Sequence, residues 1–247
     1  MRIYAIGDIH GQFEMLLAAH DRIAKDRKVT GDANAPIVHL GDFGDRGPAT
    51  WTVIDYFLDG IRRKEPWLFI KGNHDRMFTG FLSDANDQDP RLPSELYWLH
   101  PRLGGDKTLE SYGVKDPEHR PRIDVNREAR AAVPVEHVEF LTNLPLTFET
   151  PDLFFTHAGI RPGIDFSDQN EDDLLWIRQG FLDDDRDHGK LIVHGHTALD
   201  APEHLGNRVN LDSGAGYFRS LTAAVFEGRD CWTLTKQGRV PLTPSNS

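Results

Sequence analysis

Short apolar runs that stop abruptly at Gly, Asp, Asn or His recur along the chain and predict buried strands. Such runs are typical of strands that are covered on both faces. They are Ile3–Ile6, Ile37–Leu40, Trp67–Ile70, Leu153–Phe155 and Leu191–Val193. Helical spacing of apolar residues lies within Phe13–Ile23 and again after Pro48, a residue favoured at helix starts. The apolar stripe predicted for this second helix consists of Trp51, Ile54, Leu58 and Ile61.

The alternation of strands and helices predicts an α/β fold with right-handed crossovers. Because ligands in such sheets bind beyond the carboxyl ends of the strands, the polar residues after each run are expected to share one rim. Beyond His196, apolar runs at 208–212, 221–227 and 230–236 predict an antiparallel continuation or a second sheet. A helix-like pattern spans Leu174–Leu182, and the acidic run 183–187 after it is predicted to be a solvated loop.

The stretch from about Ser83 to Ala132 is polar, contains prolines and is weakly periodic. A disordered linker would have this composition, but Leu96–Leu99 and Leu103 supply apolar side chains that can be buried. We therefore expect a helical insertion over the rim (about 83–132) within a single domain that spans 1–247. The length of 247 residues suits one large domain better than two.

Net charge narrows the classes of partner. The chain has 28 Lys and Arg against 39 Asp and Glu, a net charge of −11. Nucleic acids and membrane surfaces require a basic face, so neither is expected as a partner, whereas a small phosphorylated ligand held by local cations is compatible with this charge. No apolar stretch approaches the roughly 18–20 residues of a membrane span, and no signal-peptide core is present, so a cytoplasmic location is expected.

The one cysteine, Cys231, excludes an internal disulfide framework. It also fails as the nucleophile of a thiol phosphatase, because that chemistry requires an Arg six residues later, where this chain has Gln237. Neither a disulfide scaffold nor a cysteine nucleophile is therefore expected.

The residues that follow the five runs form a metal-capable set. They are Asp8, His10, Asp42, Asn73, His157 and His196. Carboxylates, an amide and imidazoles, with no thiolate, suit Mn, Fe or Zn. Asp8 and His10 are two residues apart, so both side chains can coordinate one ion if the chain leaves the strand in an extended conformation. The two oxygens of Asp42 can bridge two ions. Because this set exceeds what one catalytic ion with open positions needs, two ions sharing a bridge are predicted.

Each of these residues taken alone has a simpler explanation. An Asp or Asn after a strand is usually a turn residue or helix cap, and a single His is usually held by ordinary hydrogen bonds. Most of the remaining histidines are assigned to that structural class: His20, His39, His100, His119, His137, His188 and His204. Independent turn chemistry would not place metal-capable residues after all five runs, and this coincidence favours a metal site.

Taken together and in order, these motifs resemble those of the calcineurin-like metallophosphoesterases. The matching segments are Gly7–Gly11, Gly41–Gly47, Gly72–Asp75, His157–Gly159 and Gly195–Thr197. The Asp-Arg-Gly that ends the second segment resembles the phosphoprotein phosphatase branch in its bacterial and phage form. The resemblance spans Gly7 to about Thr197 and implies a four-layer α/β/β/α sandwich. Asp75 and Ala158 stand where eukaryotic members have Glu and Gly, which puts eukaryotic substrate preferences in doubt.

The resemblance also implies roles for particular residues. Asp8 and His10 would hold the first metal, Asp42 would bridge, and Asn73, His157 and His196 would hold the second. His196 is favoured over the neighbouring His194, because Gly-His-Thr is the matching motif. His74 would be a general acid oriented by Asp45, and Arg46 and Arg178 would bind phosphate. Mn²⁺ is the first choice for both ions, with Fe and Zn as the others.

The activity implied first is hydrolysis of phosphoproteins or phosphopeptides at Ser/Thr, with Tyr as a further choice, by direct attack of a hydroxide that bridges the two ions. The rival is a symmetrical diadenosine tetraphosphatase or another nucleotide phosphohydrolase, and the 83–132 insertion is expected to decide between them. A metal-binding scaffold without turnover is the third reading. The presence of His74, Asp45 and Arg46 argues against it, because a scaffold needs neither a general acid nor a phosphate-binding residue. The oligomeric state is left open.

Overall fold

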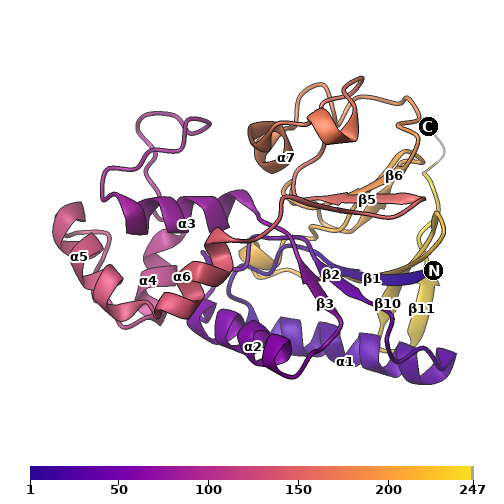
Figure 1. The fold of residues 1–247 in the computed structure, drawn as a ribbon, viewed down its shortest axis with the longest axis horizontal. Helices are drawn as coiled ribbons and strands as arrows, with labels where there is room; N and C mark the ends of the chain where they lie inside the picture. The colour runs from indigo at the N-terminus through magenta and orange to yellow at the C-terminus, as the bar shows by residue number, and fades with distance from the viewer. Residues whose placement is uncertain (246–247) are drawn as a thin grey trace.

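Two β-sheets packed face to face form the centre of the computed structural model, which describes residues 1–245 (Figure 1). The first sheet has the order β11-β10-β9-β1-β2-β3, and the second the order β4-β5-β6-β8-β7. The first consists of β1 (Arg2–Ile6), β2 (Ile37–His39), β3 (Trp67–Phe69), β9 (Ala223–Glu227), β10 (Asp230–Thr235) and β11 (Gly238–Pro241). The second consists of β4 (Thr147–Glu149), β5 (Leu153–Thr156), β6 (Leu191–His194), β7 (Glu203–His204) and β8 (Arg208–Asn210).

The five predicted runs are β1, β2, β3, β5 and β6, and they pair in parallel within their own sheets. β9 and β10 continue the first sheet in the antiparallel sense. β8 joins the second sheet, parallel to β6. The predicted antiparallel continuation therefore occurs at β9 and β10, and the predicted second sheet contains β8.

Side chains of the central strands alternate between two cores. In β1, Ile3 and Ala5 face the second sheet, whereas Tyr4 and Ile6 face the helices. In β5, Phe155 faces the first sheet and Phe154 the opposite side. Because successive side chains of a strand point to opposite faces, a strand covered on both faces must be apolar at every position. This requirement explains the continuous apolar runs.

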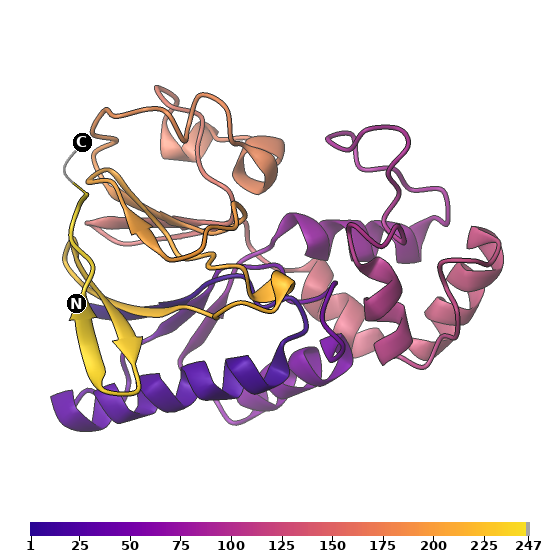
Figure 2. The same ribbon diagram turned by 180° about the vertical axis from the view of Figure 1, so that it is seen from behind.

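Helices cover the outer faces of both sheets, as Figures 1 and 2 show. α1 and α2 lie against the first sheet, and α7 lies against the second, which confirms the predicted α/β/β/α order of layers. The helices are α1 (Phe13–Thr30), α2 (Thr50–Arg62), α3 (Asn73–Ser83), α4 (Gly105–Ser111), α5 (Arg122–Ala132), α6 (Val135–Thr142), α7 (Glu171–Trp176) and the short η1 (Phe166–Asp168) and η2 (Ala215–Tyr217). Within residues 1–245, no helix has the length and apolar character needed to cross a membrane.

The stripe predicted for α2 is wrong at its two ends. Trp51 is 41% exposed and Ile61 is 47% exposed. The helix instead buries Val53, Phe57 and Gly60. A Cβ atom at Gly60 would lie 1.9 Å from the ring of Trp67 on β3, so a glycine lets the helix approach the sheet. Counting apolar residues cannot detect that contact.

The helix predicted over Leu174–Leu182 is also too long. α7 ends at Trp176, and Ile177 is extended, with φ −60° and ψ 137°. Gly180 then takes a left-handed conformation, with φ +79°. Phe181 thereby returns to the second sheet and packs in the same core as Ile192. Burial of that aromatic side chain outweighs continuation of the helix.

The segment after α3 is only partly helical. Residues 84–104 form turns, and α4 and α5 follow. Trp98, Leu99 and Leu103 are buried in the core shared with α3. The Trp98 ring stacks on Phe78 of α3 with 5.1 Å between ring centroids. Figure 1 shows these helices gathered beside the ends of β1–β3.

Candidate active site

The structure brings the six predicted ligand residues together at one rim, and each is at most 9% exposed. Five of them follow the carboxyl end of a strand, and one begins a helix. Asp8 and His10 follow β1, Asp42 follows β2, Asn73 begins α3, His157 follows β5 and His196 follows β6. Parallel pairing places these strand ends at the same edge, as the sequence predicts.

Asp42 lies at the centre of the group. Its Oδ2 is 3.5 Å from Nε2 of His10, and its Oδ1 is 3.4 Å from Nε2 of His157. Two sets of potential ligand atoms, each within 4.8 Å of one another, share this carboxylate: His10, Asp42 and His74 form one, and Asp8, Asp42 and His157 form the other. One oxygen toward each set is the geometry that a bridging carboxylate requires.

Backbone carbonyls fix the orientation of two imidazoles. Nδ1 of His10 donates to the carbonyl of Gly44, and Nδ1 of His157 donates to the carbonyl of Leu40, both at 2.8 Å. With the proton held at Nδ1, the lone pair at Nε2 is directed into the site. Histidine ligands are commonly oriented in this way.

The polar atoms of the site fit divalent ions of the Mn, Fe or Zn type. With its Nδ1 proton donated to Leu40, Nε2 of His157 meets Oδ1 of Asn73 at 2.8 Å as one acceptor facing another. Oδ1 of Asp8 and Nε2 of His196 are buried and find no hydrogen-bond partner among residues 1–245. Burial raises the pKa of Asp8 well above its ordinary value, and the carboxylates of Asp212 and Asp42 add to this effect. A cation would satisfy these acceptors, and mixed N/O donors suit those metals.

Backbone conformation aims the side chains of this rim. His10, Asp42 and His196 have φ of +48°, +52° and +65°, the left-handed region that non-glycine residues rarely adopt. Each such residue costs about 1–3 kcal/mol and persists where the surroundings enforce it. Gly195 admits the neighbouring carboxylate, because a Cβ there would lie 1.9 Å from Oδ1 of Asp8.

His74 and Asp45 form a buried pair beside Asp42. Nδ1 of His74 is 2.6 Å from Oδ2 of Asp45, which also accepts from Nε1 of Trp98 at 2.8 Å. The other oxygen, Oδ1, accepts from Oγ1 of Thr108 at 2.7 Å. Burial raises the pKa of Asp45 to about 7 and lowers the pKa of His74 to about 3. The hydrogen bond directs Nε2 of His74 toward the rim.

The two arginines expected to bind phosphate lie at the same rim. Arg46 donates to Nε2 of His10 at 2.6 Å and to Nε2 of His74 at 3.1 Å. Since an ion on His10 would use the same lone pair, the Arg46 guanidinium must move when that nitrogen becomes a ligand. Arg178 donates to the carbonyl of His196 at 3.4 Å, and burial lowers the pKa of Arg178.

His194 lies apart from the two sets of ligand atoms. Its Nδ1 is 3.0 Å from the carbonyl oxygen of Gly195, and its Nε2 is 3.3 Å from the guanidinium of Arg208. The ring packs edge-on against Phe181. His196, in contrast, has Nδ1 2.9 Å from Oδ1 of Asn73. The structure thus places His196 at the site and His194 beneath it.

Two further carboxylates buried near the rim, Asp75 and Asp212, were not predicted as functional from the sequence. Asp75 accepts from the backbone N–H groups of Gly72, Asp42 and Phe43 at 2.8–3.0 Å, which ties the Asp42 loop to the start of α3. Its position three residues into the helix is a familiar capping position, and this signal could have identified it. Asp212 follows β8, so the same strand-end pattern extends to it. Burial raises the pKa of Asp212, and the charge of Asp42 adds to the rise.

Comparison with known proteins assigns the family. Residues 1–224 match the family model of the calcineurin-like phosphoesterases. The chain belongs to this family. A bis(5'-nucleosyl)-tetraphosphatase of Anoxybacillus flavithermus, described as asymmetrical, is 27% identical over 88% of this chain and 87% of its own. The crystal structure of a cold-active protein-tyrosine phosphatase of Shewanella matches with a TM-score of 0.62 and 18% identity over 98% of this chain and 80% of its own. That of a metallophosphoesterase from Sphaerobacter thermophilus matches with a TM-score of 0.51 and 16% identity over 98% and 90%.

This membership and the clustered His and Asp side chains make the chain a metal-dependent phosphoesterase, and the family's chemistry implies divalent ions at the rim. The individual ligand assignments remain predictions. At these identities, the solved structures show a shared fold and carry no information on the substrate of this phosphoesterase.

Proposed function

We propose that this phosphoesterase hydrolyses a phosphoanhydride bond of dinucleoside polyphosphates such as diadenosine tetraphosphate. The observation that carries the proposal is the near-full-length match to curated bis(5'-nucleosyl)-tetraphosphatases, which include the Anoxybacillus protein and one of Oceanobacillus iheyensis, 24% identical over 93% of this chain. The motifs alone favour phosphoproteins first and nucleotides second as substrates. The relatives favour the reverse order.

The proposal includes the position of cleavage. The rival reading of the motifs names a symmetrical diadenosine tetraphosphatase, but both relatives are described as asymmetrical. Asymmetrical hydrolysis of diadenosine tetraphosphate gives ATP and AMP, whereas symmetrical hydrolysis gives two ADP. We therefore expect ATP and AMP.

Local charge supports a substrate with several phosphates. The chain carries a net charge of −11, yet Arg178 at the rim also lines a cavity of about 490 Å³ together with Arg91 and Arg161. Arg161 is paired with Asp173 at 2.7 Å, which leaves Arg91 and Arg178 for an anion. Guanidinium groups suit phosphate oxygens because they present fork-shaped, permanently charged donors.

The chain's own residues supply positioning and proton transfer in the proposed reaction. Two bound divalent ions would activate water and neutralise phosphoryl oxygens. Arg46 and Arg178 would hold the non-bridging oxygens of the phosphoryl group under attack. Water oxygen bonds to that phosphorus, the P–O bond of the anhydride breaks, and its electron pair passes to the departing phosphate. For proton transfer His74 would have to be the imidazolium, with Nδ1–H donated to Asp45 and Arg46 turned away from Nε2 toward the phosphate. It would then place the proton of Nε2 on the departing oxygen, while the attacking water gives up its own proton to solvent.

A substrate panel tests the proposal. Protein stripped of metal and reloaded with Mn²⁺ is given diadenosine tetraphosphate or peptides carrying pSer, pThr or pTyr, and the products are separated by anion exchange. Equal amounts of ATP and AMP, with slower release from peptides, are expected. Two ADP would overturn the cleavage position. A peptide preference would restore a phosphoprotein phosphatase, and no turnover with ions bound would favour the scaffold.

A further inference from the structure

A second cavity, of about 610 Å³, lies on the other side of η2 between α1, the segment after η2 and the end of β10. Figure 2 shows η2 and this segment passing above α1. The cavity combines apolar and cationic side chains: Met15, Arg22, Phe218, Arg219, Leu221 and Lys236 line it.

Residues 217 and 218 connect this cavity to the rim. The Tyr217 ring lies 4.8 Å from the guanidinium of Arg46 and 5.7 Å from that of Arg219. Phe218, the next residue, lines the cavity. Tyr217 is 55% exposed and Phe218 is 71% exposed, although large aromatic side chains are usually covered. Phe218 also has φ +61°, a costly conformation for a bulky residue.

The cations of the cavity have few acidic partners within residues 1–245. Arg22 donates to the carbonyl of Leu221 at 2.9 Å, and no carboxylate lies within ion-pair distance of it or of Lys236 in that part of the chain. Arg219 pairs with Asp200, an exposed residue. Nε of Arg22 and Nε of Arg219 are buried, and neither has a hydrogen-bond partner in the part of the chain that the structure describes. On a chain of net charge −11, this local excess of cations favours an anionic ligand.

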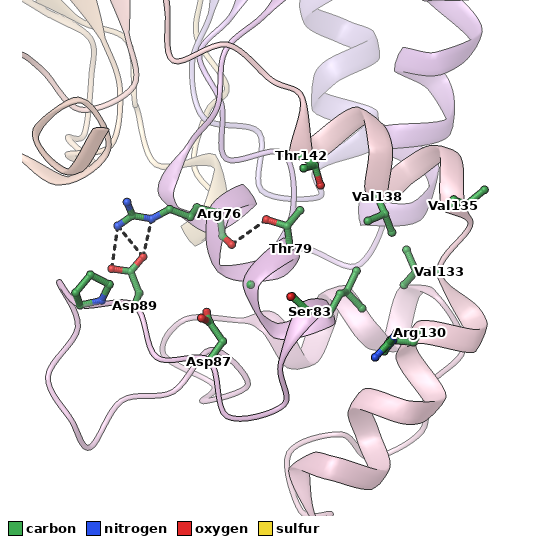
Figure 3. A pocket seen from close by; sticks show the side chains of 13 residues that line it. Arg76, Thr79, Ser83, Asp87, Asp89, Arg130, Val133, Val135, Val138 and Thr142 are labelled. Atoms are coloured by element: carbon green, nitrogen blue, oxygen red, sulfur yellow. Dashed lines mark hydrogen bonds and ion pairs between the residues drawn. The ribbon is translucent and has the colours of Figure 1, made fainter. Parts of the chain in front are cut away.

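The cavity beside α3 differs in this respect. It has a volume of about 730 Å³, and Figure 3 shows Arg76 at its edge joined to Asp89. Arg76 also pairs with Asp172 at 2.7 Å. Arg76 is thus neutralised twice, and Asp87 in the same lining opposes the charge of Arg130, so this cavity is less favourable for an anion.

We propose that the cavity beside Phe218 binds the second nucleoside of the dinucleoside polyphosphate, with the base against Phe218 and the adjoining phosphates near Arg219 and Lys236. The inference rests on the proposed function, in which the reacting phosphate lies between Arg46 and Arg178. A planar base matches an exposed aromatic face with apolar neighbours, and the polyphosphate matches the path of cations from Arg46 to Arg219. Stacking of one base on an aromatic side chain corresponds to an affinity gain of about 5- to 150-fold.

The test compares Phe218→Ala with the wild type. The KM for diadenosine tetraphosphate is expected to rise at least about fivefold, with kcat nearly unchanged. ATP and inorganic tripolyphosphate are then compared as competitive inhibitors of that reaction, because ATP carries a nucleoside and tripolyphosphate does not. The inhibition constant of ATP should rise in the variant relative to that of tripolyphosphate. An unchanged KM, or an equal rise of both inhibition constants, would overturn the inference.

Two further variants keep the result interpretable. Lys236→Glu should raise the KM for the dinucleotide and weaken its increase with ionic strength, because it removes an attraction to the phosphates that salt screens. Ile123→Ala truncates an exposed apolar residue on the distant α5 and should leave the KM unchanged. If the wild type fails to hydrolyse the dinucleotide, the proposed function fails. If the wild type succeeds and both cavity variants match it, the inference alone fails.

Discussion

Nδ1 of His74 lies 2.6 Å from Oδ2 of Asp45, and the carboxylate that orients the imidazole is itself held by Trp98 and Thr108. These two side chains come from the segment after α3, so a region outside the five strand-end motifs supports the proposed acid. Asp45 is fully buried, so its ionisation lowers the stability of the fold. The same charge orients His74, so stability and catalysis make opposite demands on this carboxylate.

Replacement of the proposed acid should reduce turnover without removing metal. For His74→Asn, we expect kcat for diadenosine tetraphosphate to fall about 10²-fold, the low end for general acid catalysis. A departing phosphate, whose second pKa is about 6, needs less protonation than an alkoxide does. Metal content is measured by elemental analysis on the same samples. Loss of an ion would instead make His74 a ligand, as its place in one of the two sets of ligand atoms allows.

Removal of the charge at Asp45 should lower kcat and spare stability. In Asp45→Asn, the amide oxygen can accept from His74 and Trp98, while the amide nitrogen donates to Thr108. Burial raises the pKa of Asp45 to about 7, so ionisation opposes folding above the carboxyl's ordinary pKa and the neutral amide removes that cost. The Tm at pH 8 should therefore match or exceed that of the wild type. A lower Tm with unchanged kcat would contradict both assignments.

Asp42→Asn should impair both metal positions at once. Its two oxygens face His10 on one side and His157 on the other, so loss of the carboxylate weakens both sets of ligand atoms. We expect fewer than two ions per chain and loss of turnover, measured by equilibrium dialysis and initial rates. Asn73→Ala is the matched comparison and should affect one position. Retention of two tightly bound ions in Asp42→Asn would exclude a bridging role.

Stability in acid should depend on a carboxylate far from the site. Asp26 accepts from Tyr4 at 2.7 Å and from Arg239 at 2.7 and 2.8 Å. Burial acts to raise the pKa of Asp26, but the Arg239 and Tyr4 hydrogen bonds outweigh it and hold the pKa below its ordinary value. The pair therefore stabilises the fold above about pH 4, and this contribution is lost as the pH falls through the native pKa.

Asp26→Asn measures this contribution. The substitution removes one of two carboxylates that contact Arg239, while Glu227 stays 2.7 Å from that guanidinium, so the loss is about 2 kcal/mol at pH 7 in urea denaturation. The free energies of unfolding of variant and wild type should converge at acid pH, once the pH has fallen through the native pKa of Asp26. Asp21→Asn, which changes an exposed residue of the same helix, serves as the control. An equal difference at both pH values would show that Asp26 acts through packing and not through its charge.

Strand positions and the rim could be predicted from the sequence because burial on both faces forces continuous apolar runs, and parallel pairing forces their polar ends together. Contacts between distant residues could not. Trp98 and Thr108 reach Asp45 across 53 and 63 residues, and neither carries a local signal for that role. The buried face of α2 depends on how Gly60 meets Trp67, which no periodicity encodes.

Stepwise addition of Mn²⁺ to metal-free protein, with diadenosine tetraphosphate as substrate, tests the account most directly. Turnover should be absent without metal and reach a plateau at two ions per chain, with ATP and AMP formed in equal amounts. A plateau after one ion, or hydrolysis of phosphopeptides while the dinucleotide remains intact, would contradict it.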